Sequence, residues 1–461
     1  MSQHHFPPGP PPIKGAIAQL RFLSDLTKDF MGFLVKNHEL YGDIFQFQIG
    51  NMRQYVITDP DLIHQVLVAQ AAKFQKDSDY TDTKRGLARF LGNGLLTSNG
   101  DFWKRQRRLV APSLHARRIE AYADTMVNYA LDTVNSWQDH ARLDISEEMR
   151  RLTMRIVGKT LFNADVVDDV EDVATAMEVI QHYFVEGRAM LLPTWVPTPA
   201  ERKARQARRA LDEISYRLIQ DWKTTREDRG DLLSMLLMAE DEDRKHMTDE
   251  QARDELVTLF LAGHETTANA LNWTWYLLAQ NPEVEAKLHA ELDTALAGQP
   301  PTLADLKRLP YTEMVVKESL RLYPPAFGFS RVAMEDLEIG GYFVPKDTVV
   351  AITSFITHHS PQWWDEPEAF QPERFTPENE AAQQRYAYVP FGGGPRVCIG
   401  NSFAMMEAQL LLATIASRYQ LRLQSGQVVE MLPLITLNPK DGLPMTVQQR
   451  QPVAVPELVL A

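Results

Sequence analysis

Cysteine is almost absent from this chain: among 461 residues there is one, Cys398. A single thiol excludes a disulfide framework within the chain and a metal site built from several cysteines. Three roles stay open for Cys398: a buried inert thiol, a nucleophile, or one soft ligand to a metal that something else holds. A nucleophile needs a general base, and the sequence suggests no histidine near Cys398.

Long apolar runs and a secretory leader are also absent. No stretch approaches the roughly 20 apolar residues that span a bilayer, and no apolar segment follows a cationic start. Residues 1–12 are instead rich in proline, which predicts a stiff extended arm. A reduced cysteine agrees with a reducing compartment. We therefore expect a soluble, cytoplasmic protein without a transmembrane anchor.

Basic residues are outnumbered by acidic ones: the chain has 48 Lys and Arg and 61 Asp and Glu, which gives a net charge of −13. This balance disfavours a nucleic-acid partner. Two clusters of basic residues are exceptions to this negative charge balance, and each is most simply interpreted as a solvated helix face. The first cluster contains Lys104, Arg105, Arg107, Arg108, Arg117 and Arg118, and the second contains Arg202, Lys203, Arg205, Arg208 and Arg209.

Helical patterns dominate what is present. The longest runs from Thr248 to Asn281, begins with a capping-box spacing and is stopped by Pro282. At about 1.5 Å per residue such a helix is on the order of 50 Å long, so it must cross the whole molecule. Shorter helices are predicted over residues 312–322 and 402–417.

Strand-like segments are short and far apart in the sequence. The fold class is therefore mainly α with a small β-rich lobe. We expect one domain over residues 1–461, with the β-rich lobe from about residues 40–60, 325–375 and 418–450 and a helical lobe from the remainder.

The residues around Cys398 favour the ligand role. Glycines at 392–394 allow backbone turns that other residues resist, and Gly400 lets a flat group approach closely. A helix that begins just after Cys398 favours the thiolate, and Arg396 suits a carboxylate. With Phe391 beside it, this loop is suited to axial ligation of haem.

A second motif lies in the middle of the long predicted helix, at residues 262–267. Ala262 and Gly263 are small enough to let a planar group lie against the helix. Thr266 could hydrogen-bond dioxygen and, with Glu265, guide protons to it. The bland alternative is that Thr266 bonds a helix carbonyl and Glu265 is simply paired. His264 is treated as non-ligating.

Two charged pairs complete the pattern: Glu318 with Arg321 on a helix, and Arg374 within the segment 372–375. Taken alone, such pairs are common on surfaces and contribute little.

Together these motifs resemble one family, the cytochrome P450 haem-thiolate monooxygenases, from about Phe6 to the C-terminus. The segment from Phe391 to Gly400 matches the haem-binding signature, and residues 262–267 match the oxygen-activation motif, with Glu in place of the more usual Asp. The remaining matches are Glu318 and Arg321 with Arg374, Trp103 with Arg107, and Arg331 after Pro325.

The resemblance implies a cytochrome P450 fold in which the long helix crosses the molecule over a buried haem b. Cys398 is then the axial ligand to iron, and Thr266 and Glu265 are catalytic. Glu318, Arg321 and Arg374 form a structural triad. The other implied cofactor-binding residues are Trp103, Arg107, Arg331, Phe391, Arg396 and Gly400.

The same resemblance implies an apolar pocket and hence a lipophilic substrate. A fatty acid is favoured, with steroids and terpenes open. The expected reaction inserts one oxygen atom of O2, and the alternative is a haem-thiolate peroxygenase, isomerase or non-catalytic lipid or gas binder. The expected pocket residues are Phe90, Leu95, Leu96, Phe260, Ala262, Phe327, Phe329 and Ile435.

Electrons are expected from a separate ferredoxin or flavodoxin with its NAD(P)H reductase. Lys104, Arg105 and Arg108 would attract that acidic donor. The apolar segment 190–197 could rest on a membrane surface or act as a lid over the substrate channel.

Overall fold

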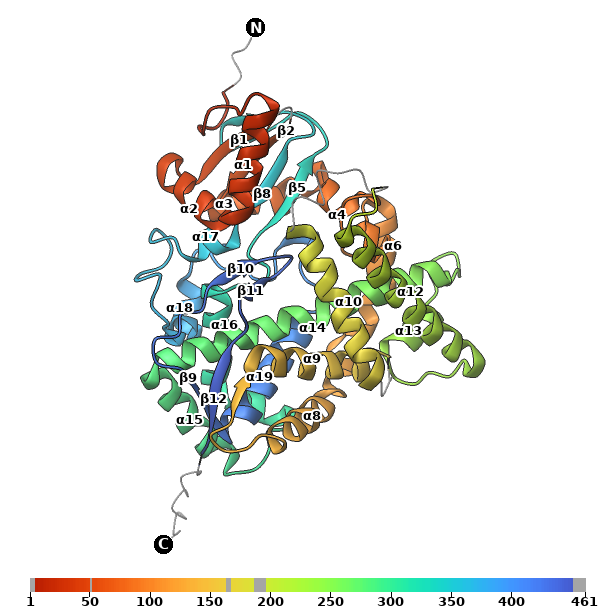
Figure 1. Ribbon diagram of the computed structural model, residues 1–461, viewed down its shortest axis with the longest axis vertical. Coiled ribbons are helices and arrows are strands. Elements are labelled where there is room, and N and C mark those ends of the chain that lie inside the picture. Colours follow the sequence, from red (N-terminus) through yellow and green to blue (C-terminus); the bar gives the residue numbers. More distant parts are fainter. Residues whose placement is uncertain (1–4, 50–51, 163–166, 186–195, 451–461) are drawn as a thin grey trace.

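The computed structural model describes residues 5–49, 52–162, 167–185 and 196–450. Helices dominate, and their arrangement around one central helix is seen in Figure 1. The helices are α1 (Ala16–Lys28), α2 (Phe30–Tyr41), α3 (Pro60–His64), α4 (Ser78–Thr81), α5 (Ala88–Leu91), α6 (Gly100–Val110), α7 (Ala116–Glu120), α8 (Ala123–Asn135), α9 (Ile145–Phe162), α10 (Val167–Val185), α12 (Pro199–Thr225), α13 (Leu232–Met238), α14 (Asp249–Gln280), α15 (Pro282–Leu296), α16 (Pro310–Leu322), α17 (Ser354–His358), α18 (Pro377–Ala382) and α19 (Asn401–Ala416).

The central helix is α14, which has 32 residues. Thr248 caps it as the sequence predicts: its hydroxyl accepts from the Gln251 N–H, and the Gln251 side chain accepts from the Thr248 N–H. The helix ends before Pro282, whose ring prevents its continuation. Buried on most sides, α14 packs against α9, α12, α16 and α19 and crosses the middle of the molecule (Figure 1).

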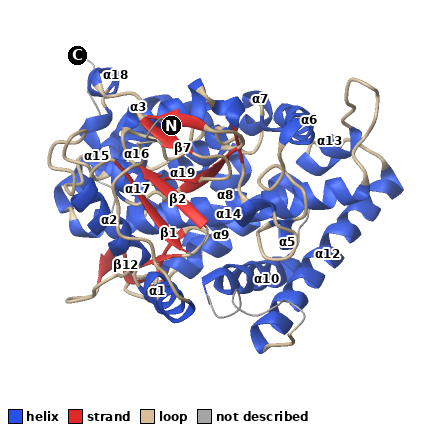
Figure 2. Ribbon diagram, turned by 90° about the horizontal axis from the view of Figure 1, so that it is seen from above, coloured by secondary structure: helices blue, strands red, loops and turns tan. Residues whose placement is uncertain are grey.

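The strands are short and belong to several sheets. They are β1 (Ile44–Ile49), β2 (Met52–Ile57), β3 (Phe74–Gln75), β4 (Arg142–Asp144), β5 (Phe329–Ala333), β6 (Leu337–Ile339), β7 (Tyr342–Val344), β8 (Val349–Ile352), β9 (Tyr419–Leu423), β10 (Met431–Pro433), β11 (Leu437–Pro439) and β12 (Pro444–Gln449). The largest sheet has the order β1-β2-β8-β5-β3, and β2 pairs with β8 in parallel. The strands of this sheet gather on one side, away from α6, α10, α12 and α13 (Figure 2).

The C-terminal strands do not join that sheet. β9 and β12 form a separate sheet with β4, at the opposite end of the molecule (Figure 1). Residues 418–450, which the sequence analysis grouped with the β-rich lobe, are thus divided between this sheet and the β10–β11 hairpin. This division could not be predicted because β12 pairs with β4, which lies between two helices in the sequence and has no strand-like pattern of its own.

The triad of Glu318, Arg321 and Arg374 is assembled in the interior. The Arg321 guanidinium donates to both Glu318 oxygens, at 2.7 and 2.8 Å, and Arg374 Nε donates to Glu318 Oε1 at 3.2 Å. Arg321 also donates to the His358 carbonyl, and His358 Nε2 accepts from the Val389 N–H at 2.9 Å. The triad therefore anchors the segment that leads to Cys398.

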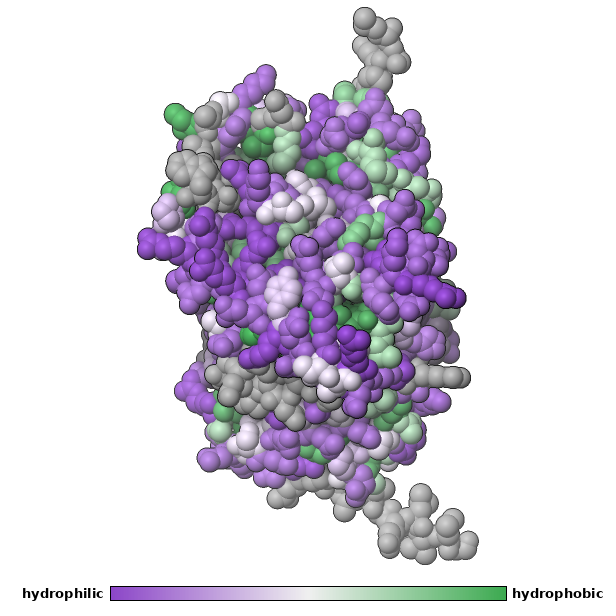
Figure 3. All heavy atoms as spheres, turned by 90° about the vertical axis from the view of Figure 1, so that its right-hand side faces the viewer, coloured by the Kyte–Doolittle hydropathy of each residue, from purple (hydrophilic) through white to green (hydrophobic). Residues whose placement is uncertain are grey.

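The face of the molecule that includes α12 and α13 carries few clustered apolar side chains. It is mainly hydrophilic, with apolar residues in scattered spots (Figure 3). Within the described ranges, no helix combines the length and the apolar character needed to cross a bilayer.

Candidate active site

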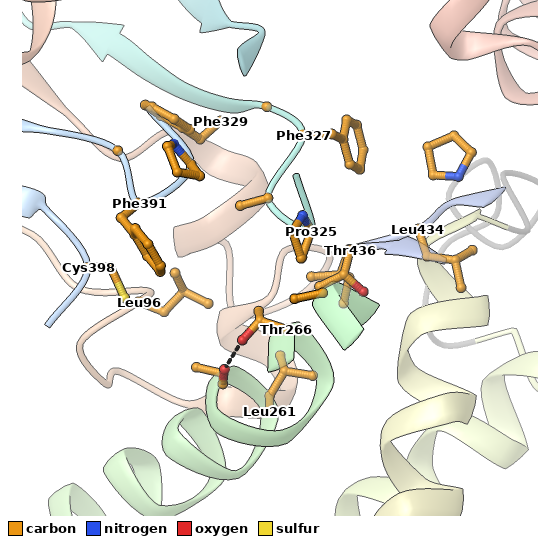
Figure 4. Close-up of a pocket in the computed structure, with 18 of the residues that line it drawn as sticks. Leu96, Leu261, Thr266, Pro325, Phe327, Phe329, Phe391, Cys398, Leu434 and Thr436 are labelled. Carbon is orange, nitrogen blue, oxygen red and sulfur yellow. Dashed lines mark hydrogen bonds between the residues drawn. The ribbon is translucent and has the colours of Figure 1, made fainter. Parts of the chain in front are cut away.

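A cavity of about 1150 Å³ lies where α14, the loop before α19, β5 and the β10–β11 hairpin meet. Cys398 and Thr266 both line it and come from different walls, as Figure 4 shows. Two segments separated by more than a hundred residues thus converge on one space.

The Cys398 loop is shaped by close backbone contacts. The Cys398 N–H donates to the Phe391 carbonyl at 2.9 Å and closes the loop. Gly394 has φ of +65°, and a Cβ there would lie 1.8 Å from the Leu67 carbonyl oxygen, so only glycine fits. Gly400 is the residue before α19, and a Cβ on it would meet the Cys398 sulfur at 4.0 Å.

The Cys398 side chain is exposed, and its exposure is to the cavity that it lines. Protein surrounds the thiol, and this burial raises its pKa, while the Gly400 N–H and the charge of Arg107 lower it. The sequence analysis expected the helix terminus to favour the thiolate. Burial outweighs that effect for the free thiol, so a bound cation would have to favour the ionised form.

Thr266 presents its side chain to the cavity from α14. Its hydroxyl donates to the Ala262 carbonyl at 2.7 Å (Figure 4), as the bland alternative expected, and leaves oxygen lone pairs for a cavity ligand. Ala262 and Gly263 both line the cavity, and Gly263 also meets a packing requirement on α9. A Cβ on Gly263 would lie 3.0 Å from the Val157 side chain on α9, so this glycine permits close helix packing.

Glu265 is buried and is not among the described residues that line the cavity. It contacts His264, Asn269 and Thr436 instead. Thr436, on the turn between β10 and β11, lines the cavity and was not predicted from the sequence.

Positive charge concentrates on one wall of the cavity. Arg107, Arg331 and Arg396 all line it, and Arg396 lies over the Trp103 ring, with Cζ 4.1 Å from the centroid. Burial and the charges of Arg331 and Arg107 lower the pKa of Arg396 to about 10. Within the described residues, Arg396 Nη1 has no hydrogen-bond partner. This group of guanidinium side chains is therefore suited to bind an anion.

Lys76 adds a fourth cation that the sequence did not reveal. Its ammonium lies 3.7 Å from the centroid of the Tyr80 ring, and the side chain lines the same cavity. Burial, followed by the charges of Arg331 and Arg396, lowers the Lys76 pKa well below its usual range. No local pattern marks Lys76, because its role depends on residues about 250 and 320 positions away.

The comparisons with known proteins agree on one family. The cytochrome P450 family model matches residues 7–444. The chain belongs to the cytochrome P450 family. Among relatives, cyclooctatin synthase from Streptomyces melanosporofaciens is 37% identical over 451 residues, which cover 94% of each chain. Pentalenene oxygenase from Streptomyces avermitilis is 33% identical and covers 98% of this chain and 100% of that protein.

The fold comparison gives the same answer. The structure of retinoic acid-bound cyanobacterial CYP120A1 matches with a TM-score of 0.85 at 25% identity, covering 97% of this chain and 100% of that chain. The predicted fold class and the predicted monooxygenase family are therefore confirmed.

Cytochromes P450 are haem-thiolate enzymes, and the residues present fit haem. Cys398, the only cysteine, faces the cavity and would ligate the iron. The unpartnered Arg396 Nη1 and its neighbouring cations would bind the two propionates, for which carboxylate-binding guanidinium groups are suited. Phe391 lines the cavity near Cys398 and would lie beside the macrocycle.

Replacing Lys76 with methionine should weaken haem binding. The variant keeps the packing of the side chain but removes one cation from the propionate wall. We expect haem to transfer to a competing apo-globin roughly tenfold faster, which corresponds to about 1.4 kcal/mol. Lys73→Met is the matched control, because Lys73 is exposed and pairs with Glu335 at 3.0 Å. Equal rates for the two variants would remove Lys76 from the haem site.

The predicted substrate-pocket residues divide into two groups. The cavity is lined by Leu95, Leu96, Ala262, Phe327, Phe329 and Ile435. Phe90 and Phe260 lie outside the lining among the described residues, which corrects the prediction. The Phe90 side chain is fully buried, and its ring packs edge-on against Tyr183, 5.6 Å between centroids. Phe260 is buried in the same apolar cluster, and its carbonyl accepts from His264.

The basic run on α6 is less available than its sequence suggests. Arg105 Nε donates to Asp241 at 2.6 Å, Arg108 contacts Glu242, and Lys104 pairs with Asp101 at 2.9 Å. The two acidic partners on the 239–248 connection are about 135 residues away in the sequence. Of the predicted membrane or lid segment 190–197, residues 190–195 lie outside the described residues.

Proposed function

We propose that this cytochrome P450 inserts one oxygen atom of O2 into a cyclic terpene. The main observation behind this proposal is that the cavity side chains labelled around Thr266 in Figure 4 are largely apolar. Apolar linings select ligands that bring no unpaired polar group. The relatives named for cyclooctatin and pentalenene support a terpene over the fatty acid that the sequence favoured.

Roles follow for the residues that meet in the cavity. When bound, haem supplies the iron at which O2 is activated, with the Cys398 thiolate donating electron density to it. Thr266 would hydrogen-bond the oxygen and Glu265 would hold a proton for it. Leu96, Leu261 and Leu434 would exclude water and orient the hydrocarbon skeleton.

The partners remain part of the proposal. We infer that the enzyme acts in the cytoplasm as one domain, residues 1–461, and receives electrons from a separate ferredoxin or flavodoxin and its NAD(P)H reductase. Because Lys104, Arg105 and Arg108 all have acidic neighbours, the basic run supports donor docking less than its bare sequence implied.

A spectroscopic titration tests the substrate class. A substrate that displaces water from the iron shifts the Soret band, so binding is read without turnover. We expect cyclic sesquiterpenes and diterpenes to shift the band at micromolar concentrations. Linear fatty acids of matched carbon number are the control and should give much smaller shifts, because the terpene assignment predicts a site that fits a cyclic hydrocarbon skeleton against the largely apolar side chains labelled around Thr266. Shifts by the fatty acids alone would refute the terpene assignment.

A further inference from the structure

The connection between α5 and α6 forms part of the cavity lining. Its first half, residues 92–97, is called the 92–97 turn below, and it is closed by the Thr97 hydroxyl, which donates to the Gly92 carbonyl at 2.7 Å. Leu95 and Leu96 on this turn both line the cavity, and Leu96 is labelled in Figure 4. An apolar site selects its ligand largely by shape, so the position of this turn decides which skeletons fit.

Two consecutive acids on α14 hold the 92–97 turn. Asp254 Oδ2 accepts from the Asn93 N–H at 2.7 Å, and Glu255 Oε2 accepts from the Leu95 N–H at 3.1 Å. Both acidic residues are buried, and neither is among the described residues that line the cavity. Hydrogen bonds to a carboxylate are roughly twice as strong as those between neutral groups. Side chains outside the cavity therefore fix the backbone of its lining.

The 92–97 turn also lies directly on α14. Gly92 has φ of +69°, and a Cβ on it would lie 1.9 Å from Asp254 Oδ1. A Cβ on Gly94 would lie 2.5 Å from Thr258 Oγ1. A side chain at either position would push the turn away from the helix. The two glycines and the two acids thus act together to define one position for the turn.

Glu255 makes a second hydrogen bond, to α6. Its Oε1 accepts from Gln106 Nε2 at 3.1 Å, and Gln106 is fully buried. The same helix carries Trp103 and Arg107, which line the cavity and are expected to contact haem. Both partners of Glu255 are neutral N–H donors, so each carboxylate oxygen has to accept. One side chain therefore joins α14 to the 92–97 turn and to the helix beside the haem site.

We propose that Asp254 and Glu255 are positioning residues for substrate selection, because their carboxylates hold the 92–97 turn on α14 and thereby set where Leu95 and Leu96 lie in the cavity. The inference rests on the proposed function and deepens it, since it concerns which hydrocarbon skeletons the lining accepts. A turn that is held before the ligand arrives adds no ordering cost to binding. When the turn is loosened, a ligand that contacts it must order it and loses affinity.

Nitrogen ligands of the iron test this proposal without a substrate or turnover. Imidazole is small, whereas a biphenylyl imidazole carries a long apolar arm that has to lie against the cavity lining. Both ligands shift the Soret band when their nitrogen binds the iron, so a titration gives each dissociation constant. At pH 8 Glu255 is largely ionised, since burial raises its pKa to about 7.

We expect Glu255→Leu to separate the two ligands. The biphenylyl ligand should bind roughly tenfold more weakly, the size expected when two side chains have to be ordered on binding. Imidazole should bind as in wild type, because it is too small to depend on the turn. A Glu255→Leu variant that binds the biphenylyl ligand as tightly as wild type would overturn the proposal.

Glu255→Gln is the conservative variant. Its amide oxygen can accept from the Leu95 N–H, and the Gln106 amide can turn its oxygen toward the new donor. The affinity for the biphenylyl ligand should therefore stay close to that of wild type. Equal losses in Glu255→Gln and Glu255→Leu would mean that the hydrogen bond to the turn is not what matters.

Leu96→Ala shows whether Glu255 acts through the turn. This variant should also weaken the biphenylyl ligand, because it removes part of the lining. Adding Glu255→Leu to it should then cost much less than in wild type, since both changes act on the same contact. Fully additive losses would contradict a positioning role.

Thr274→Val is the matched control for a general loss of stability. Thr274 is buried on α14, its hydroxyl donates to the Ala270 carbonyl at 2.7 Å, and it is not one of the described residues that line the cavity. Both ligands should bind this variant as they bind wild type. If Glu255→Leu fails to take up haem, Glu255→Leu with Gln106→Leu takes its place, because it removes both partners of the bond to α6.

The two proposals fail separately. The imidazole ligands bind iron whatever the natural substrate is, so a failed terpene titration leaves their affinities intact. Additive losses in the Leu96 and Glu255 variants leave the substrate class intact.

Discussion

Replacing Glu318 with glutamine should destabilise the protein by about 3–5 kcal/mol, because it leaves buried guanidinium charge without a counterion. Glu318 and Arg321 have fully buried side chains, and Arg374 is 11% exposed. The carboxylate also accepts from the Gln371 N–H at 3.0 Å, so the amide would turn a donor toward donors. Equilibrium unfolding of the holoenzyme in urea measures the loss.

The control for this substitution lies next to Arg374. Glu373 pairs with Lys287, but its side chain is 46% exposed, so Glu373→Gln should cost less than about 1 kcal/mol. A small effect in both variants would mean that the triad does not hold the segment before Cys398.

Glu407→Gln should instead stabilise the protein, and the gain in stability should depend on pH. Glu407 is fully buried on α19, and among the described residues neither carboxyl oxygen has a hydrogen-bond partner. Burial raises its pKa to about 8, and the nearby Thr267 hydroxyl offsets only part of that. The native state therefore retains a proton that the unfolded chain loses near its ordinary pKa of about 4.3.

The sign follows from linkage. Below about pH 4.3, Glu407 is protonated in both the native and the unfolded protein, so it does not reduce stability. Between that pH and 8 only the unfolded chain releases the proton, so the wild-type free energy of unfolding falls by about 1.4 kcal/mol per pH unit. Glutamine is neutral throughout, so the variant should gain stability over wild type as pH rises and level off above pH 8. Melting temperatures at pH 5 and pH 8 give the difference.

A second buried glutamate supplies the comparison. Burial raises the pKa of Glu285 as well, but its carboxylate is paired with Arg422 at 2.7 Å, so Glu285→Gln removes a charged hydrogen bond and should be less stable than Glu407→Gln at pH 8. Equal effects of the two substitutions at both pH values would show that Glu407 is ionised in the native state.

The parts of the fold that local sequence determines could be predicted. The capping box at Thr248 and the stop at Pro282 placed α14 within one residue at each end. The predicted helices at 312–322 and 402–417 match α16 and α19 within two residues. Such signals are short-range, because caps, proline stops and alternating apolar residues act within a few positions.

The site was predictable only where a motif carries it. Cys398, Thr266 and Arg396 lie in recognisable patterns and converge on the cavity. Lys76 and Thr436 belong to no pattern, since the residues that give them a role lie far away in the sequence: Arg331 and Arg396 for Lys76, and Asn269 and Glu265 for Thr436. The prediction for Phe90 was wrong because an aromatic side chain near the cavity can pack on a neighbouring helix as readily as on a ligand.

The parallel pairing of β2 with β8 also has a consequence for synthesis on the ribosome. Ile57 meets Ile352, so one edge of β2 waits for a partner made roughly 300 residues later. At 5–20 residues per second this delay is about 15–60 s. During that interval the nascent β1–β2 hairpin exposes an unpaired edge, which is a site for aggregation or chaperone capture. Fragments that stop before β8 should therefore accumulate as insoluble material, however well their helices form.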